Sequence, residues 1–128
     1  MSYLLDTHVL LWYINGDKRL SKSHQQLIED PKVDIALSYV SLWEITIKVS
    51  LDKLQLSGEI QELVSLINDT GIILIDISTQ DLVELRELPF HHRDPFDRLL
   101  IAQAKAKKMI LLTEDQHIKK YDEVIPVV

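Results

Sequence analysis

Four short apolar runs, separated by longer segments with helical spacing, constrain the fold of this chain more than any other feature. The runs lie at residues 3–6, 33–38, 71–77 and 109–113. Strands that alternate with amphipathic helices form parallel sheets whose two faces are both covered. The sequence therefore predicts an α/β fold with a mostly parallel sheet between helices. A last run at 124–128 is a further strand candidate, which Pro126 would restrict to a sheet edge.

The segments between these runs predict helices. Ser21 is suited to cap a helix that Pro31 would stop. Asp94 followed by Pro95 marks another start, because Asp can accept an orphan N–H and Pro has none to lose. The segment 40–51 has β-branched content that would suit a strand, but the spacing of its apolar residues favours a helix. The expected helices cover residues 8–14, 22–29, 40–51, 59–69, 79–88, 95–107 and 114–121.

Length and composition narrow the class of protein. A chain of 128 residues is expected to be one domain, residues 1–128. It has no cysteine, which excludes disulfides and thiolate metal sites and fits a reducing, cytoplasmic compartment. No signal peptide or membrane-spanning run is expected, since no uncharged stretch approaches the ~18 residues needed. Twenty acidic residues against fourteen Lys and Arg give a net charge of −6, so binding to nucleic acid would need a local basic patch or cations.

Acidic residues gather where the apolar runs end. Asp6 closes the first run, Asp115 follows the last, Glu44 comes soon after the second, and Asp97 lies in the first turn of the helix before the last run. The carboxyl ends of parallel strands meet at one sheet edge, where ligands bind. Carboxylates ~4 Å apart repel by about 4 kcal/mol at an effective dielectric of about 20, so a cluster needs a proton or a cation. Hard oxygen ligands suit Mg²⁺ or Mn²⁺.

Each acid also has a simpler interpretation that the sequence leaves open. Asp6 and Asp115 would each suit the N-cap of a following helix. Asp97 would favour the positive end of its helix dipole, and Glu44 would pair with Lys48 one turn later.

Four motifs, LLDTH, SLWEI, RDPFDRLLIAQA and LLTED, occur in an order that resembles the PIN-domain ribonucleases, specifically VapC-type toxins of type II toxin–antitoxin systems. The resemblance implies that four acids are catalytic and bind metal, with three hydroxyl residues supporting them. The acids are Asp6, Glu44, Asp97 and Asp115, and the hydroxyl residues are Thr7, Thr113 and Ser41. Asp94 and Glu114 flank matched positions, which leaves open whether either replaces a neighbouring ligand.

The resemblance also implies a fold and a function. The fold would be a three-layer α/β/α sandwich around a central sheet of four or five strands. The activity would be endonucleolytic cleavage of RNA by a metal-activated water, with one or two Mg²⁺ or Mn²⁺ ions. The partners would be an RNA substrate, a VapB-like antitoxin and a second copy of the chain. The preference for RNA over DNA rests on this resemblance alone, because the acids do not need a 2′-hydroxyl.

Two groups of residues are candidates for binding these partners. Lys48, Arg93 and Arg98 lie near the acids in sequence and would contact the RNA backbone, although each would equally suit an ordinary surface or helix position. Trp12, Tyr13, Trp43 and Ile47 would form a dimer patch or an antitoxin groove, although apolar residues at helical spacing more often belong to the core.

Functions of other classes fit less well. A phosphatase of the haloacid dehalogenase type needs a second Asp where this chain has His8, and a receiver domain needs a Lys where Glu114 and Asp115 follow the last run. Gly16, Gly58 and Gly71 are too far apart for a phosphate-binding loop. The main alternative is a PIN-fold module that binds RNA or protein without catalysis.

Overall fold

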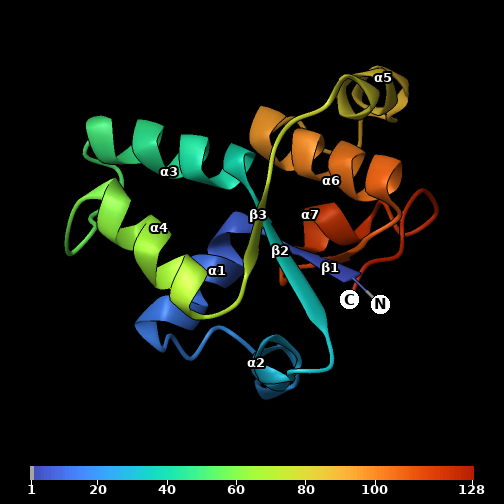
Figure 1. Cartoon of the computed structure of the whole chain (residues 1–128). Coiled ribbons are helices and arrows are strands. Elements are labelled where there is room, and N and C mark those ends of the chain that lie inside the picture. Colours follow the sequence, from blue (N-terminus) through green and yellow to red (C-terminus); the bar gives the residue numbers. More distant parts are fainter. Residues whose placement is uncertain (1) are drawn as a thin grey trace.

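Four parallel strands form the centre of the protein in the computed structural model, which describes residues 2–128 (Figure 1). The strands are β1 (Ser2–Leu5), β2 (Asp34–Ser38), β3 (Ile73–Ile75) and β4 (Ile110–Leu112). They lie in the order β3-β2-β1-β4, and Leu4 of β1 is level with Ala36 of β2 and Leu111 of β4. The predicted parallel sheet is confirmed.

The run at 124–128 pairs with the sheet edge but does not form a regular strand. Leu111 and Val127 make an isolated parallel bridge beside β4. The amides of Leu111 and Thr113 donate to the carbonyls of Pro126 and Val128. Pro126 has no N–H to donate, so only an irregular pairing forms at this edge. The expected fifth strand is therefore reduced to a short edge contact.

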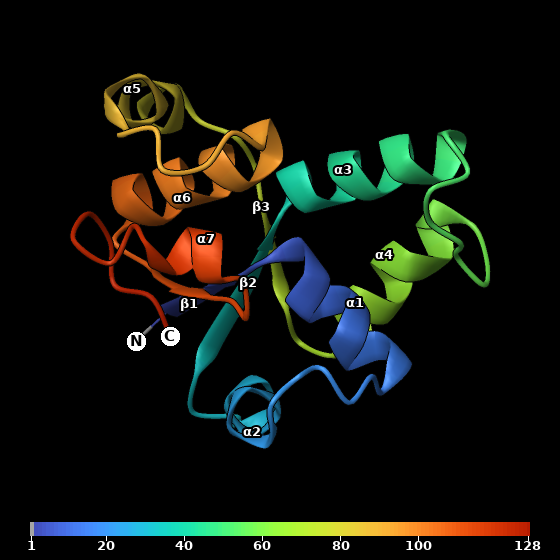
Figure 2. The same cartoon turned by 180° about the vertical axis from the view of Figure 1, so that it is seen from behind.

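Helices cover both faces of the sheet. Among residues 2–128 they are α1 (Thr7–Asn15), α2 (Lys22–Glu29), α3 (Tyr39–Ser50), α4 (Ile60–Asp69), α5 (Thr79–Glu87), α6 (Pro95–Lys107) and α7 (Gln116–Lys119). Helices α1, α2 and α4 lie on one side, and α5, α6 and α7 lie on the other (Figures 1 and 2). Within the described residues, none of these helices has the length and apolar character needed to span a membrane.

The alternation of side chains along the strands creates two apolar cores. Leu4 and Leu111 point to the core that contains α6 and α7, while Leu5 and Leu112 point to the core that contains α1 and α4. Each core is lined by fully buried aliphatic side chains. Because both faces of the sheet are buried, the strands are continuous apolar runs in the sequence.

Helix ends follow the predicted signals in two cases and differ in one. The Ser21 side chain accepts a hydrogen bond from the backbone amide of His24 at the start of α2. The Asp94 side chain accepts one from the backbone amide of Asp97 at the start of α6, whose first residue is Pro95. Both predicted caps are confirmed. Helix α7 begins only at Gln116, instead of residue 114, because Asp115 is its N-cap and has extended backbone angles.

A buried polar cluster fastens α5 to α6. The fully buried Asp81 carboxylate accepts from Lys107 Nζ at 2.8 and 2.9 Å and from Gln103 Nε2 at 3.0 Å. Burial would raise the pKa of Asp81, but the hydrogen bonds from Lys107, Ser78 and Gln103 bring that pKa below its ordinary value. A second ion pair joins Lys105 to Glu84 at 3.1 Å on the more exposed side of the same helices.

We predict that Asp81→Asn destabilises the protein by about 2 kcal/mol, because a buried ion pair that loses one partner leaves groups uncompensated. Glu84→Gln is the matched control, and its more exposed ion pair with Lys105 should contribute less than about 1 kcal/mol. Urea denaturation followed by circular dichroism measures both changes. Equal losses in the two variants would contradict the role given to Asp81.

Candidate active site

Three of the four predicted acids come after the carboxyl ends of β1, β2 and β4, and the fourth, Asp97, lies in the first turn of α6. Asp6 directly follows β1, and Thr113 directly follows β4. Strand β2 runs straight into α3, whose first turn is capped by the Ser38 hydroxyl accepting from the amide of Val40 at 3.0 Å. The chain leaves β1 into α1 on one face of the sheet and leaves β4 toward α7 on the other (Figure 2). Diverging connections of this kind open the crevice in which α/β proteins bind ligands.

Asp6 is a buried carboxylate with one oxygen unpartnered. Its side chain is 1% exposed, and Oδ2 accepts from the Thr113 hydroxyl at 2.8 Å. Oδ1 has no hydrogen-bond partner within residues 2–128. Asp6 occupies the N-cap position of α1 but makes no side-chain capping bond to the described helix, so the capping interpretation is wrong for its carboxylate. Burial raises the pKa of Asp6, helped by the charges of Asp115 and Glu44 and opposed by Thr113 and His8.

Asp97 is held in the first turn of α6 and faces a histidine. Its Oδ2 lies 2.7 Å from Nε2 of His92. Burial, together with the charges of Asp6, Asp94 and Glu44, raises the pKa of Asp97 to about 7, and the hydrogen bond with His92 opposes this rise. Asp97 therefore holds a proton part of the time near neutral pH. Its interaction with Asp6 shows that the two carboxyl groups are near each other, as the sequence predicts.

Glu44 and Lys48 pair across one turn of α3, as the simpler interpretation of Glu44 predicts. Lys48 Nζ donates to Glu44 Oε2 at 2.6 Å. Burial lowers the pKa of Lys48, but Glu44, Asp94 and Asp97 raise it above its ordinary value overall. Glu44 is buried, and its Oε1 lacks a partner in the part of the chain that the structure describes. The ion pair with Lys48 therefore provides a hydrogen bond to only one of the two carboxylate oxygens of Glu44.

Asp115 connects to Asp6 through a shared hydroxyl. The Asp115 amide donates to Thr113 Oγ1 at 3.0 Å, and this same hydroxyl donates to Asp6. The Asp115 carboxylate accepts from the amide of His117 at 2.7 Å, so its N-cap interpretation is confirmed. A ligand atom of Asp115 still lies within 4.8 Å of ligand atoms of Asp97 and His92. Asp115 therefore both caps α7 and borders the acid cluster.

The remaining hydroxyl residues align helices. Thr7 Oγ1 donates to Ser41 Oγ at 2.8 Å, and both side chains are buried. This bond joins the start of α1, next to Asp6, to the first turn of α3, which carries Glu44.

The two flanking acids have structural partners. Asp94 caps α6 by accepting the Asp97 amide at 3.0 Å. Glu114 accepts from the amide of Ser21 at 3.2 Å and pairs with His24 of α2. Neither contact supports the alternative in which these residues replace Asp97 or Asp115.

The cluster fits a divalent cation. Burial of several carboxylates beside one another is unfavourable unless protons or a cation offset their charge. The unpartnered oxygens Asp6 Oδ1 and Glu44 Oε1 are buried, hard ligand atoms of the kind that Mg²⁺ and Mn²⁺ prefer. The donor set of the predicted site residues therefore matches the predicted cofactor.

The three predicted RNA contacts differ in environment. Lys48 is half-buried beside the acids, and Arg93 is exposed in the loop before α6. Arg98 is buried and donates to the carbonyls of Pro89 and Leu88 and to the Tyr121 hydroxyl. The prediction for Arg98 is therefore corrected, because its guanidinium group already serves the interior.

The sequence reasoning placed His92 near the acids as a candidate for binding phosphate but did not predict its contact with Asp97. Its loop reaches Asp97 because Tyr121, far along the chain, binds the loop backbone. No periodicity or motif in the sequence links these positions, and the only available signal was the proximity of His92 to the DPFD segment.

Comparison with known proteins identifies the fold and the family. A sequence model of the PIN domain matches residues 3–124. None of the curated proteins matches significantly. A chain of the VapBC2 crystal structure from Rickettsia felis, bound to a promoter DNA fragment, has a TM-score of 0.72 and 19% identity, covering 100% of this chain and 98% of that chain.

Two further solved structures agree. A chain of VapBC-1 from nontypeable Haemophilus influenzae has a TM-score of 0.69 and 16% identity, covering 100% of this chain and 97% of that one. A chain of VapBC-5 from Mycobacterium tuberculosis has a TM-score of 0.63 and 18% identity, with coverages of 99% and 95%. These likenesses show the fold, and the sequence match includes every acid of the cluster: the chain belongs to the PIN domain family.

Proposed function

We propose that this protein is a divalent-metal-dependent endoribonuclease and the toxin of a toxin–antitoxin pair. The observation that carries the proposal is the convergence of buried carboxylates at one sheet edge with two of their oxygens unpartnered. Two kinds of comparison support it: the chain is a PIN domain, and its structural neighbours include chains of VapBC toxin–antitoxin complexes.

Asp6, Asp97 and Glu44 would hold the principal Mg²⁺ or Mn²⁺ ion, and Asp115 would complete the site directly or through water. When bound, such an ion lowers the pKa of an attacking water and offsets the charge that develops on the phosphate. The protein's own part is to fix the ligands. Thr113 orients Asp6 through its hydroxyl, and the Thr7–Ser41 bond holds the helices that carry Asp6 and Glu44 in register.

Substrate binding would use the cations beside the acids. The Lys48 ammonium stays charged because Glu44 raises its pKa, and it would bind a phosphate group of the substrate at the edge of the cluster. Arg93 is exposed in the neighbouring loop and would contact the backbone further along. The choice of RNA rests on the resemblance to VapC-type toxins, since hydrolysis by an activated water needs no 2′-hydroxyl.

A VapB-like antitoxin would be the protein partner. The solved relatives described above are VapBC assemblies, one of them bound to promoter DNA. On this chain a hollow of about 450 Å³ lies between α1 and α4. Leu11, Ile14, Leu56 and Leu63 contribute apolar walls, which suits an apolar segment of a partner.

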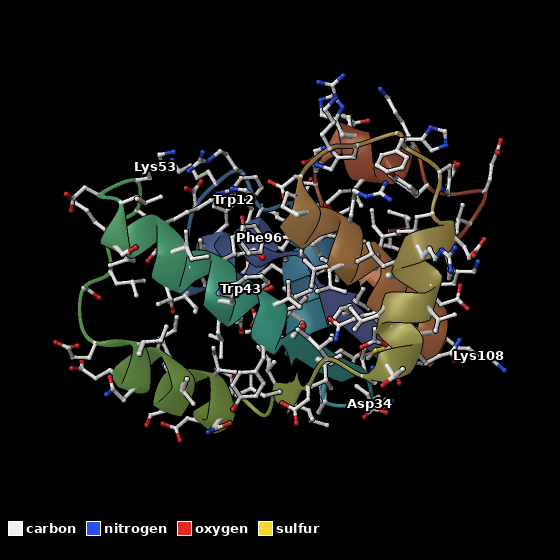
Figure 3. The ribbon with its side chains drawn as sticks, turned by 90° about the horizontal axis from the view of Figure 1, so that it is seen from above. Trp12, Asp34, Trp43, Lys53, Phe96 and Lys108 are labelled. Carbon is white, nitrogen blue, oxygen red and sulfur yellow. The ribbon has the colours of Figure 1, made fainter. Side chains whose placement is uncertain are left out.

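A second copy of the chain would cover the apolar side chains left exposed on α3 and α5. These are Tyr39, Trp43, Leu82 and Val83. Trp43 is 52% exposed and packs edge-to-face on Phe96 at 4.9 Å between ring centroids (Figure 3). Trp12 and Tyr13 are half-buried against the core on the α1 side, so they are not among these exposed side chains. Ile47 is also half-buried.

Asp6→Asn should abolish RNA cleavage, with a loss of at least ~100-fold, because it removes a ligand charge at nearly constant volume. The measurement is cleavage of total RNA by the purified chain with Mn²⁺ or Mg²⁺, and with excess EDTA. Asp34→Asn is the matched control: the same change at an exposed position that begins β2, at the opposite end of the strand from α3.

Discrete fragments that require both the metal and Asp6, and that persist with Asp34→Asn, would support the nuclease. Intact RNA from folded, antitoxin-free protein under every condition would contradict it. The catalytically silent binding module would then be the better account.

Trp43→Arg should convert a dimer into a monomer, because a charge cannot be buried in the apolar patch without a partner. Light scattering coupled to size-exclusion chromatography measures the mass. Gln61→Arg, on α4 and exposed, is the matched control that should leave the mass unchanged. A monomeric wild-type chain at micromolar concentration would rule out this interface.

A further inference from the structure

His92 lies inside the acid cluster, although it is not one of the acids that the sequence motifs single out. Its Nε2 is 2.7 Å from Asp97 Oδ2. Its ring stacks on that of His117, with centroids 5.4 Å apart and planes at 8°. Ligand atoms of His92, Asp97 and Asp115 all lie within 4.8 Å of one another.

The position of His92 is fixed by buried groups. The side chain of Tyr121 is fully buried, and its hydroxyl accepts from the backbone amides of His91 at 3.0 Å and His92 at 3.1 Å. The same hydroxyl donates to the Pro89 carbonyl at 2.7 Å and accepts from Arg98 at 3.1 Å. Three hydrogen bonds from the interior thus hold the backbone of the loop that presents the His92 ring.

The surroundings of His92 supply further ligand atoms from other elements. Asp6 from the end of β1 and Glu44 from α3 each keep one buried carboxylate oxygen without a partner inside the described chain. The charges of Asp6 and Glu44 both raise the pKa of Asp97, the carboxyl group that His92 contacts. The group whose ligand atoms lie within 4.8 Å of one another consists of one imidazole nitrogen and the carboxylate oxygens of Asp97 and Asp115.

We propose that His92 is a nitrogen ligand of the divalent cation at this site, sharing it with Asp97 and Asp115, and that it makes the site prefer Mn²⁺ over Mg²⁺. The proposal rests on the proposed function, because it assumes that the acid cluster holds a cation. Mg²⁺ binds through oxygen and keeps its waters, whereas imidazole nitrogen suits transition metals. An all-carboxylate cluster would lack this source of selectivity.

The competing role is positioning. In that role the His92 ring only donates to Asp97 and holds its carboxylate in place, as outer partners of metal ligands do. A glutamine at this position keeps an N–H donor for Asp97 but has no imidazole nitrogen. His92→Gln therefore separates the two roles, and His92→Ala removes both.

The experiment measures Mn²⁺ binding from the free-ion electron paramagnetic resonance signal, and Mg²⁺ binding by competition, for wild type, His92→Gln and His92→Ala. We expect both variants to lose at least ~10-fold in Mn²⁺ affinity, with a smaller change for Mg²⁺, so that the Mn²⁺/Mg²⁺ preference falls. His91→Ala, the adjacent exposed histidine, is the matched control and should keep both affinities. Circular dichroism verifies that the variants fold.

A second measurement needs no variant. Pulsed electron paramagnetic resonance of the Mn²⁺-loaded wild-type protein should show hyperfine coupling to an imidazole nitrogen. Absence of that coupling, or an unchanged Mn²⁺/Mg²⁺ preference in His92→Gln, would overturn the ligand role of His92. Metal-dependent cleavage that still requires Asp6 would in that case leave the proposed function intact. Failure of the wild-type chain to bind either ion would overturn both.

Discussion

Repulsion among buried carboxylates is the constraint on which the rest of this structure depends. The parallel sheet brings the acids that follow β1, β2 and β4 to one edge, and burial there raises the pKa of Asp6 and of Asp97. The Lys48 ammonium pairs with Glu44, and the His92 ring contacts Asp97 Oδ2 at 2.7 Å. The oxygens left over are those that a divalent cation would satisfy.

The rest of the fold serves to hold these acids against their own repulsion. The two apolar cores pack against opposite faces of the sheet and hold the ends of its strands together. The buried Asp81 cluster fixes α5 on α6, and α6 carries Asp97. The Tyr121 hydroxyl fixes the loop that leads into α6. Buried polar contacts made by residues outside the acid cluster thus help to set the geometry of the site.

Local sequence patterns predicted the sheet, the order of the helices and the convergence of the acids. Burial of a strand on both faces requires a continuous apolar run, and helix starts require capping residues such as Ser21 and Asp94, so both features can be recognised in the sequence. Contacts between segments that are distant in the sequence have no such local pattern. Arg98 is a cation in a polar stretch, yet carbonyls and Tyr121 hold it inside. His92 meets Asp97 only because Tyr121 binds its loop, and the end of the chain pairs with β4 too irregularly to form the expected strand. All three outcomes depend on tertiary packing and not on periodicity.

Proton release on Mn²⁺ binding tests the central claim most directly. The pKa of Asp97 is raised to about 7 from 3.8, so its protonated form is favoured in the fold. The stability that Asp97 contributes through this preference for its protonated form is fully present below about pH 4. It is lost as the pH rises through about 7, where Asp97 loses its proton in the folded protein. A cation must displace that proton. Titration calorimetry at pH 6.5 in buffers of different ionisation enthalpy should show release of about one proton, declining by pH 8.5. Mn²⁺ binding without proton release at pH 6.5, or no binding at either pH, would contradict the account.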